Sequence, residues 1–157
     1  MKRFFMAAAA VAAVFSIGAA APAAAAPHSE DKVLTSTVAA DDVSAMAVSC
    51  SNLYWCIWRD PNATNNNYRY TWFGSDGNYA NNYWSGVTVS NKASGVWNQG
   101  DRQFVVIFDG PDYTGNWACV PANTHIPDLR NAATGDTPVG WWNERISSHK
   151  WSNTCTR

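Results

Sequence analysis

The four cysteines constrain this chain of 157 residues more than any other feature. They are Cys50, Cys56, Cys119 and Cys155. An even number of cysteines in a short domain predicts two disulfides where the chain is exported, and three pairings are then conceivable. Only five residues separate Cys50 from Cys56, so a local disulfide can form there and leave Cys119 for Cys155. We expect these two disulfides, of which the second closes the longer loop. Zinc binding by the cysteines is disfavoured, because the sequence contains no Cys-x-x-Cys pair.

Residues 1–26 have the pattern of a secretory signal peptide. Two basic residues near the start are followed by an apolar run up to Ala21, and small residues follow it. This order, with Ala24-x-Ala26 at its end, predicts cleavage after Ala26. The alternative is a transmembrane anchor, but the apolar run is near the lower length limit for spanning and no basic cluster follows it. We therefore expect a secreted, extracellular protein that does not associate with the membrane after cleavage.

Residues 27–48 differ in composition from the rest of the chain. They contain no aromatic residue, and four acidic side chains stand against one lysine. Val33, Leu34 and Val38 are too few to build a core. We interpret this stretch as a disordered linker or a pro-segment and place the folded domain at residues 49–157.

The domain favours an all-β fold. It contains all nine tryptophans, all six tyrosines and fifteen asparagines. Short aromatic and β-branched runs, such as residues 54–58 and 104–108, are each followed by turn residues, and no stretch has a sustained helical period. The many asparagines supply turn conformations and disfavour helices.

The domain also repeats itself at an interval of about 50 residues. A shift of 50 places Ile57 on Ile107 and Pro61 on Pro111, and a shift of 53 aligns the segments that end the two units. Two such units suit two antiparallel sheets that pack face to face with Greek-key connections.

Several segments resemble known families. Cys50-(x5)-Cys56-Ile57-Trp58 resembles the opening of small secreted bacterial metalloproteinase inhibitors with a βγ-crystallin-like fold. Asp112-Tyr113-Thr114-Gly115 is similar to the Tyr-x-Gly corner of a βγ-crystallin Greek-key motif. Residues 91–98 and 143–151 are similar to the Ser-bearing segments that close such motifs, although Gly95 replaces a serine. The resemblance covers residues 50–152 and implies two Greek-key motifs that form a disulfide-linked, βγ-crystallin-like sandwich.

Charge and motifs argue against two classes of function. The formal net charge is −1 and charged residues make up 15% of the chain, which disfavours a nucleic-acid partner. The acidic residues of the domain occur singly, and its two histidines, His125 and His149, stand in no catalytic motif. We therefore do not expect an enzyme.

The resemblance implies one possible metal site. βγ-crystallin domains bind calcium through an Asn/Asp-Asn/Asp-x-x-Ser/Thr-Ser segment, and residues 143–148 nearly match it. The implied oxygen ligands are Asn143, Glu144, Ser147 and Ser148, which suit a hard cation. The alternative is a hairpin in which the serines only cap a turn. No cofactor is required in either case.

The resemblance further implies that the domain inhibits an extracellular peptidase, in the first instance a metallopeptidase, as a monomer. A substrate-like inhibitor presents a constrained segment to the peptidase cleft. The candidate is Cys119–Val120, because a disulfide at Cys119 would constrain the segment and Val120 is apolar. The alternative is that both residues belong to a core strand.

A second function stays open from the sequence. Exposed aromatic rings stack on sugars, and the tryptophans exceed what a small core needs. The domain could then be a non-catalytic cell-wall or polysaccharide-binding module, with or without calcium. The candidate rings are Tyr79, Tyr83, Trp84, Trp141 and Trp142.

Overall fold

The structure is a computed structural model that describes residues 30–36, 48–63 and 66–157. The predicted signal peptide, residues 1–26, lies outside the described residues. The strands are β1 (Thr35–Ser36), β2 (Trp55–Trp58), β3 (Arg69–Trp72), β4 (Tyr83–Trp84), β5 (Val87–Thr88), β6 (Gly95–Asn98), β7 (Phe104–Phe108), β8 (Trp117–Val120), β9 (Thr124–Ile126), β10 (Ala132–Ala133) and β11 (Ser148–Ser152). In the described part of the chain, short 3₁₀ helices accompany them: η1 (Glu30–Lys32), η3 (Tyr79–Asn81), η4 (Pro111–Tyr113) and η5 (Leu129–Asn131). No helix in these described ranges is long and apolar enough to cross a membrane.

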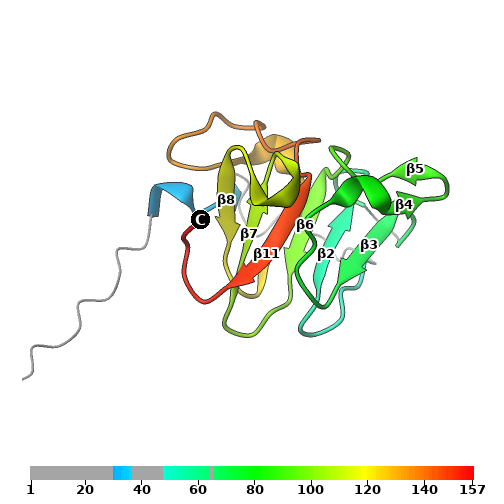
Figure 1. Cartoon of the computed structure of the whole chain (residues 1–157), viewed down its shortest axis with the longest axis horizontal. Helices are drawn as coiled ribbons and strands as arrows, with labels where there is room; N and C mark the ends of the chain where they lie inside the picture. The colour runs from blue at the N-terminus through cyan, green and yellow to red at the C-terminus, as the bar shows by residue number, and fades with distance from the viewer. Residues whose placement is uncertain (1–29, 37–47, 64–65) are drawn as a thin grey trace, which may run out of the picture.

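Two antiparallel sheets form the body of the domain. One has the strand order β3-β2-β6-β9 and the other the order β11-β7-β8. Figure 1 shows β8, β7 and β11 on one side of the molecule and β6, β2 and β3 on the other. The all-β prediction is therefore confirmed.

Each sheet borrows a segment from the other half of the chain. β9, from the second unit, pairs with β6 of the first, where Val96 lies opposite Ile126. In return, Asp76 of the first unit bridges His149 in β11 through two backbone hydrogen bonds of 2.9 and 3.0 Å. This exchange makes the two units a pair of interlocked Greek-key motifs.

The repeat predicted from the sequence is visible in the capping of the 3₁₀ helices. Asn78 accepts a hydrogen bond from the backbone of Ala80, and Asp128, 50 residues later, accepts one from Arg130. Such side chains satisfy donors that a helix start leaves unpaired. The same local chemistry therefore begins the same turn in both motifs.

The segments that close the two motifs bind each other reciprocally. The backbone N–H of Asn91 donates to Ile146, and the backbone N–H of Glu144 donates to Ala93, both at 2.9 Å. Asn91 and Glu144 both have a positive φ, near 55°. The two closing segments are thus related by the same shift of 53 residues that the sequence shows.

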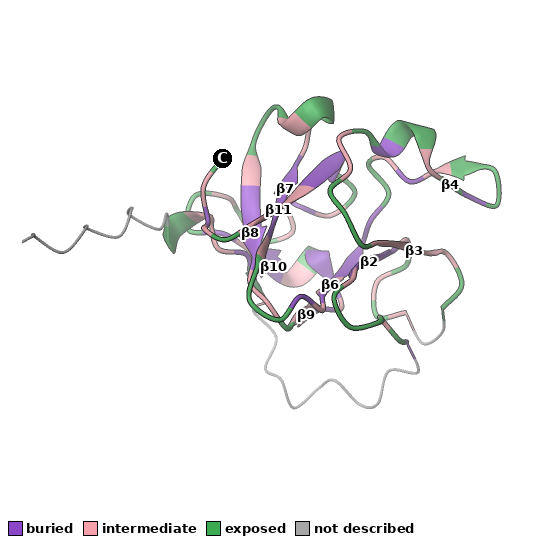
Figure 2. Cartoon of the chain, turned by 60° about the horizontal axis from the view of Figure 1, so that its bottom comes forward, coloured by how far each residue is buried: buried purple, intermediate pink, exposed green. Residues whose placement is uncertain are grey.

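The main core lies between the sheets. It combines side chains from both motifs, among them Trp55 and Ile57 of β2 with Val105 and Ile107 of β7. None of these four is exposed to solvent. Figure 2 shows the burial of β2 and of β7, which is buried from Val105 onward.

Both disulfides are formed, between Cys50 and Cys56 and between Cys119 and Cys155. These are the two pairs that the loop lengths favour. The first closes a loop at the entrance to β2, and the second ties the C-terminal segment to β8.

One stretch differs from its expected state. Residues 27–48 were interpreted as a disordered linker or pro-segment, but residues 30–36 within them dock on the domain. Leu34 is only 1% exposed and belongs to the main core, and β1 pairs with β10. The low aromatic content of the stretch gave no sign of this docking, because a single aliphatic side chain enters a core built by residues far along the chain. The boundaries of the signal peptide and the domain stay predictions.

Candidate functional site

The segment predicted to inhibit a peptidase lies inside the fold. Cys119 and Val120 end β8, and neither side chain is exposed. Val120 pairs with Val105 of β7 and belongs to the main core, while the carbonyl of Cys119 accepts a hydrogen bond from the N–H of Leu34 at 2.7 Å. A peptidase cannot reach Val120 unless β8 leaves its sheet. The prediction of this inhibitory segment is wrong, and the alternative, a core strand, describes both residues (Figure 2).

The four implied calcium ligands do not converge. The hydroxyl of Ser148 donates to the carbonyl of Gly110 at 2.7 Å and accepts the N–H of Tyr113 at 3.3 Å. The hydroxyl of Ser147 donates to the side chain of Asn91 at 2.9 Å. Both serines therefore fasten the folded hairpin, as the alternative interpretation had it.

The other two implied ligands do share a surface depression. It is lined by Asn91, Asp109, Asn143, Glu144 and Arg145. The side-chain oxygen of Asn143 is buried there without a hydrogen-bond partner among the described residues. Both oxygens of Asp109, however, accept hydrogen bonds from Asn116, and the Arg145 cation disfavours a second cation. The four implied ligands therefore do not form one calcium site. Within the described ranges, no three His, Cys, Asp or Glu side chains lie together in a way that could hold a metal ion.

His149 belongs to a buried hydrogen-bond chain. Trp55 donates its indole N–H to the hydroxyl of Tyr79 at 3.0 Å, and that hydroxyl lies 2.7 Å from Nδ1 of His149. Nε2 of His149 lies 3.0 Å from the carbonyl of Gly74, which can only accept. The proton must therefore be on Nε2, and Nδ1 accepts from Tyr79. Every member of the chain is satisfied when the imidazole is neutral.

Burial lowers the pKa of both histidines of the domain. Burial lowers the pKa of His149 to about 4, against weaker opposing effects of the Gly74 carbonyl and Asp76. Burial also raises the pKa of Tyr79. His125 stacks on Trp97 with ring centroids 4.4 Å apart, and burial lowers its pKa too. Both ring nitrogens of His149 are engaged in hydrogen bonds inside the core, whereas His125 is partly buried against Trp97.

Most of the rings proposed to bind sugars are buried. Tyr79 and Trp142 are not exposed at all, and Trp84 is 4% exposed. Trp141 is half-buried and carries the Arg145 guanidinium 4.6 Å from its ring centroid. Tyr83, at 58% exposed, is the one ring of the five that presents an open surface, on the β4–β5 hairpin that projects from the body in Figure 1.

A different surface combines exposed apolar side chains with a rigid backbone. Leu53 is 46% exposed and Phe73 is 66% exposed. They border one shallow depression together with Trp151, and we call its lining the Leu53 patch. Its residues are Leu53, Phe73, Gly100, Asp101, Gln103 and Trp151.

The loop that carries Leu53 is held from several sides. The Cys50–Cys56 disulfide closes it. The N–H of Leu53 donates to the carbonyl of Gln99 at 2.9 Å, and the N–H of Gln99 donates back to Tyr54 at 3.0 Å. Tyr54 in turn packs on Phe73, with ring centroids 5.6 Å apart.

Leu53 has an unusual backbone conformation. Its φ is 67°, in the left-handed region that a bulky side chain rarely adopts. Leu53 was not among the site residues predicted from the sequence. The available signal was an aliphatic residue between two disulfide-forming cysteines, but its exposure follows from this φ and from contacts with residues 73 and 99, which no local pattern reveals.

Comparisons with known proteins bear on the fold. No protein-family model and no curated protein matches this chain. A domain solved in work on the evolution of the eye lens βγ-crystallin domain fold is 15% identical, with a TM-score of 0.48, over 76% of this chain and 96% of that one. Spherulin 3a from Physarum polycephalum is 18% identical, with a TM-score of 0.47, over 67% and 89% of the two chains.

A βγ-crystallin from an archaeon is 10% identical, with a TM-score of 0.44, over 65% of this chain and the whole of that one. None of these three is described as a peptidase inhibitor. Likeness at this level concerns the arrangement of strands and carries no activity with it. By its own strand order the chain is an all-β, two-motif Greek-key sandwich, and the solved structures that it resembles are of the βγ-crystallin type.

Proposed function

We propose that this protein is a secreted inhibitor of an extracellular peptidase, with a metallopeptidase as the first target class to test, and that the Cys50–Cys56 loop makes the contact. The target class follows from the resemblance of Cys50-(x5)-Cys56-Ile57-Trp58 to metalloproteinase inhibitors. The observation that supports the loop is Leu53, an exposed apolar residue with φ 67° inside a disulfide-closed loop.

Rigidity is the property that suits this loop to inhibition. A leucine with positive φ costs conformational energy and persists only where its surroundings enforce it. Here the disulfide and the two backbone hydrogen bonds to Gln99 enforce it. The side chain is therefore oriented before any partner arrives, which lowers the entropy lost on binding.

The surroundings of Leu53 have the composition of a binding centre. Leu53 and Phe73 supply apolar area, while Asp101 and Gln103 border it with polar groups. Protein interfaces concentrate their binding energy in such apolar centres with a polar rim. We expect the partner to offer a pocket for an aliphatic side chain.

The backbone conformation predicts how the loop would inhibit. Peptidases bind substrates as extended strands, in which φ is strongly negative. A residue at φ 67° cannot take that path without unfolding the loop. We therefore expect Leu53 to block the cleft without being cleaved, so that the loop is recovered intact from the complex.

A peptidase panel tests the proposal. The purified full chain is assayed against a thermolysin-type metallopeptidase and against serine and cysteine peptidases. Leu53→Asp should weaken inhibition at least about tenfold, which corresponds to about 1.4 kcal/mol. Val139→Asp is the matched control, because Val139 is also an exposed aliphatic residue, at 57%, and lies outside the Leu53 patch.

The results of the panel test the inhibitor function and the position of the inhibitory loop separately. If the parent inhibits no peptidase in the panel, the proposed function fails. If the parent inhibits and both variants inhibit equally well, the function holds and the Leu53 loop is not its site.

The alternative function, polysaccharide binding, is favoured by one observation. Tyr83 is exposed on a hairpin whose turn residues, Ser85 and Gly86, both have positive φ, as a tight two-residue turn requires. A pulldown on insoluble cell-wall polysaccharide, with Tyr83→Ala as the variant, tests this alternative. Retention of the parent and loss of the variant would favour it over inhibition.

A further inference from the structure

Residues Glu30–Ser36, which we call the N-terminal strap, consist of the 3₁₀ turn η1 followed by a short extended segment that adds a strand to the domain. The N–H of Leu34 donates to the carbonyl of Cys119 at 2.7 Å, and Val33 forms a parallel bridge with Cys119. Thr35 and Ser36 then pair antiparallel with Ala133 and Ala132. The strap therefore covers the outer edge of β8 and pairs with β10, as its place beside β8 in Figure 1 shows.

Comparison of the two motifs shows that the strap is an addition to the repeated scaffold. In the first motif, Asn82 is the C-cap of η3, and the chain continues into β4, which pairs with its own return strand β5. In the second motif, Ala132, 50 residues later, is the C-cap of η5 and the first residue of β10. β10 pairs with β1 of the strap. The counterpart of the Trp84–Val87 pair is the bridge between Thr134 and Thr137, so the second motif has a return of its own and the strap is an additional strand.

The strap also carries an apolar anchor. Leu34 is 1% exposed and joins the main core, whose members include Val120 and Ala132. Val33 packs on the smaller cluster formed by Val106, Phe108 and the second disulfide. One fully buried aliphatic side chain is a typical specificity contact for a peptide added to a sheet edge.

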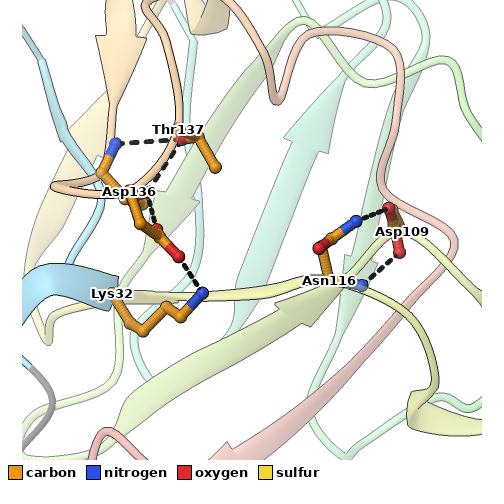
Figure 3. A network of polar contacts seen from close by, with 6 residues as sticks. Lys32, Asp109, Asn116, Asp136 and Thr137 are labelled. Atoms are coloured by element: carbon orange, nitrogen blue, oxygen red, sulfur yellow. Dashed lines mark hydrogen bonds and ion pairs between the residues drawn. The ribbon is translucent and has the colours of Figure 1, made fainter.

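Charge provides a second point of recognition. Lys32 forms an ion pair with Asp136, and its ammonium lies 5.4 Å from the centroid of the Trp117 ring. Figure 3 shows Lys32 reaching toward Asp136 beside Thr137. The N–H of Gly135 donates to the carbonyl of Asp31 at 2.8 Å, which fixes the register next to this ion pair.

We propose that the groove between β8 and β10 is a peptide-binding site, which the strap occupies in the intact chain. The ligand class is a peptide with a basic residue two positions before an aliphatic residue, as in Lys32-Val33-Leu34, whose backbone is extended after the basic residue. Among the described residues the strap binds the domain through non-covalent contacts, so a separate peptide of this pattern makes the same hydrogen bonds, ion pair and apolar contact. The groove shares no residue with the Leu53 patch, so its test does not depend on the proposed inhibitor function.

The strap itself is the competitor that any such peptide must displace. Attachment to the same chain gives the strap a high effective concentration at the groove. A peptide therefore binds well only when the strap is weakened or released. A substitution in the strap that leaves the groove intact exposes the site without removing any part of the chain.

The test uses the full chain with Leu34→Asp, which places a charge where the core accepts only an apolar group. A fluorescent peptide with the sequence of residues 28–38 is titrated into the variant and the parent, and its anisotropy is measured. We expect the variant to bind at least about tenfold more tightly than the parent, because the parent's strap occupies the groove. Binding should also raise the thermal midpoint of the variant.

Two matched controls make the result specific. A peptide that carries Leu34→Asp should not bind. When Asp136→Lys is added to the Leu34→Asp chain, binding of the native-sequence peptide should weaken. Binding of a peptide that carries Lys32→Glu should strengthen, because the ion pair then forms with its charges exchanged. Asp136 is a surface residue, so the second substitution leaves the core unchanged.

The inference is overturned if the folded Leu34→Asp chain does not bind the peptide with the native sequence of residues 28–38. It is also overturned if this chain binds the native peptide and the peptide that carries Leu34→Asp equally well. If that variant does not fold, a protease site placed between residues 37 and 47 of the parent replaces it. After cleavage, the labelled peptide should exchange with the strap, and absence of exchange with the domain still folded would also overturn the inference.

Discussion

Acidification from pH 7 to pH 4.5 should destabilise this domain through His149. The imidazole is fully buried and accepts from Tyr79 at Nδ1 while it donates to Gly74 at Nε2. A second proton, on Nδ1, would oppose the Tyr79 hydroxyl and would add a charge to the core. The folded state therefore resists protonation, and burial lowers the pKa of His149 to about 4 from an ordinary 6.5.

The sign and size of the effect follow from the two pKa values. As the pH falls through 6.5 the unfolded chain takes up the proton, but the folded chain does not until the pH approaches 4. The free energy of unfolding is therefore highest above pH 6.5 and falls across this window. A gap of roughly 2.5 pH units corresponds to about 3 kcal/mol at most, a large part of the stability of a small domain.

The contributions of other titratable groups to the pH dependence of stability can be distinguished from that of His149. Burial also lowers the pKa of His125, so this residue contributes in the same direction as the pH falls below 6.5. The pKa of Asp128 is lowered by its hydrogen bond to Arg130, and that of Asp136 by Lys32, so their stabilisation is lost only as the pH falls below the ordinary value of 3.8. The histidines therefore dominate between pH 6.5 and pH 4.5.

Urea unfolding with the disulfides intact, followed by tryptophan fluorescence at several pH values, measures this dependence. His149→Gln keeps a donor for Gly74 but cannot be protonated, so its stability should be lower at pH 7 and almost independent of pH. His125→Gln, the matched control, should keep most of the slope. A parent with constant stability from pH 6.5 to 4.5, or a His149→Gln variant with the parent's slope, would refute the reasoning.

Three further changes test the packing by urea unfolding at pH 7. Leu34→Ala should lower the free energy of unfolding by about 2–5 kcal/mol, and a change below about 0.5 kcal/mol would show that the strap is not part of the core. Joint replacement of Cys119 and Cys155 by serine should cost about 4 kcal/mol, against about 2 kcal/mol for the shorter disulfide loop, because separations of 36 and 6 residues differ in closure entropy. Gly95→Ala should cost about 1–3 kcal/mol, because an added Cβ would lie 2.8 Å from the backbone oxygen of Pro127; a variant as stable as the parent contradicts this.

The fold could be predicted because its determinants are local and occur twice. The runs that become β2 and β7 are short, aromatic or β-branched, and followed by turns, so their strand character is written in a few consecutive residues. Ile57 and Ile107 lie 50 residues apart and both enter the main core. Gly115 takes a positive φ of 80° at the predicted corner, where a Cβ would meet the Asp109 carboxylate.

The site could not be predicted in the same way, because its determinants are distant in the sequence. The run Trp117–Val120 fits both a core strand and an exposed constrained segment, and only its pairing with β7 and with Leu34 decides between them. Leu34 lies in an acidic, aromatic-free stretch, and the residue to which its N–H donates, Cys119, is far along the chain. The exposure of Leu53 depends on a backbone conformation that disulfide and loop contacts impose jointly.

The differences between the two motifs indicate where function resides. Features that both motifs share, such as the caps at Asn78 and Asp128, are sufficiently explained by the sandwich itself, which needs each of them twice. The disulfide-closed Leu53 loop occurs only before β2, and the strap occurs only beside β10. Neither is required by the repeated scaffold, since the other motif folds without it. The strained backbone of Leu53 and the N-terminal strap therefore need an explanation beyond folding. Contacts with other molecules provide one.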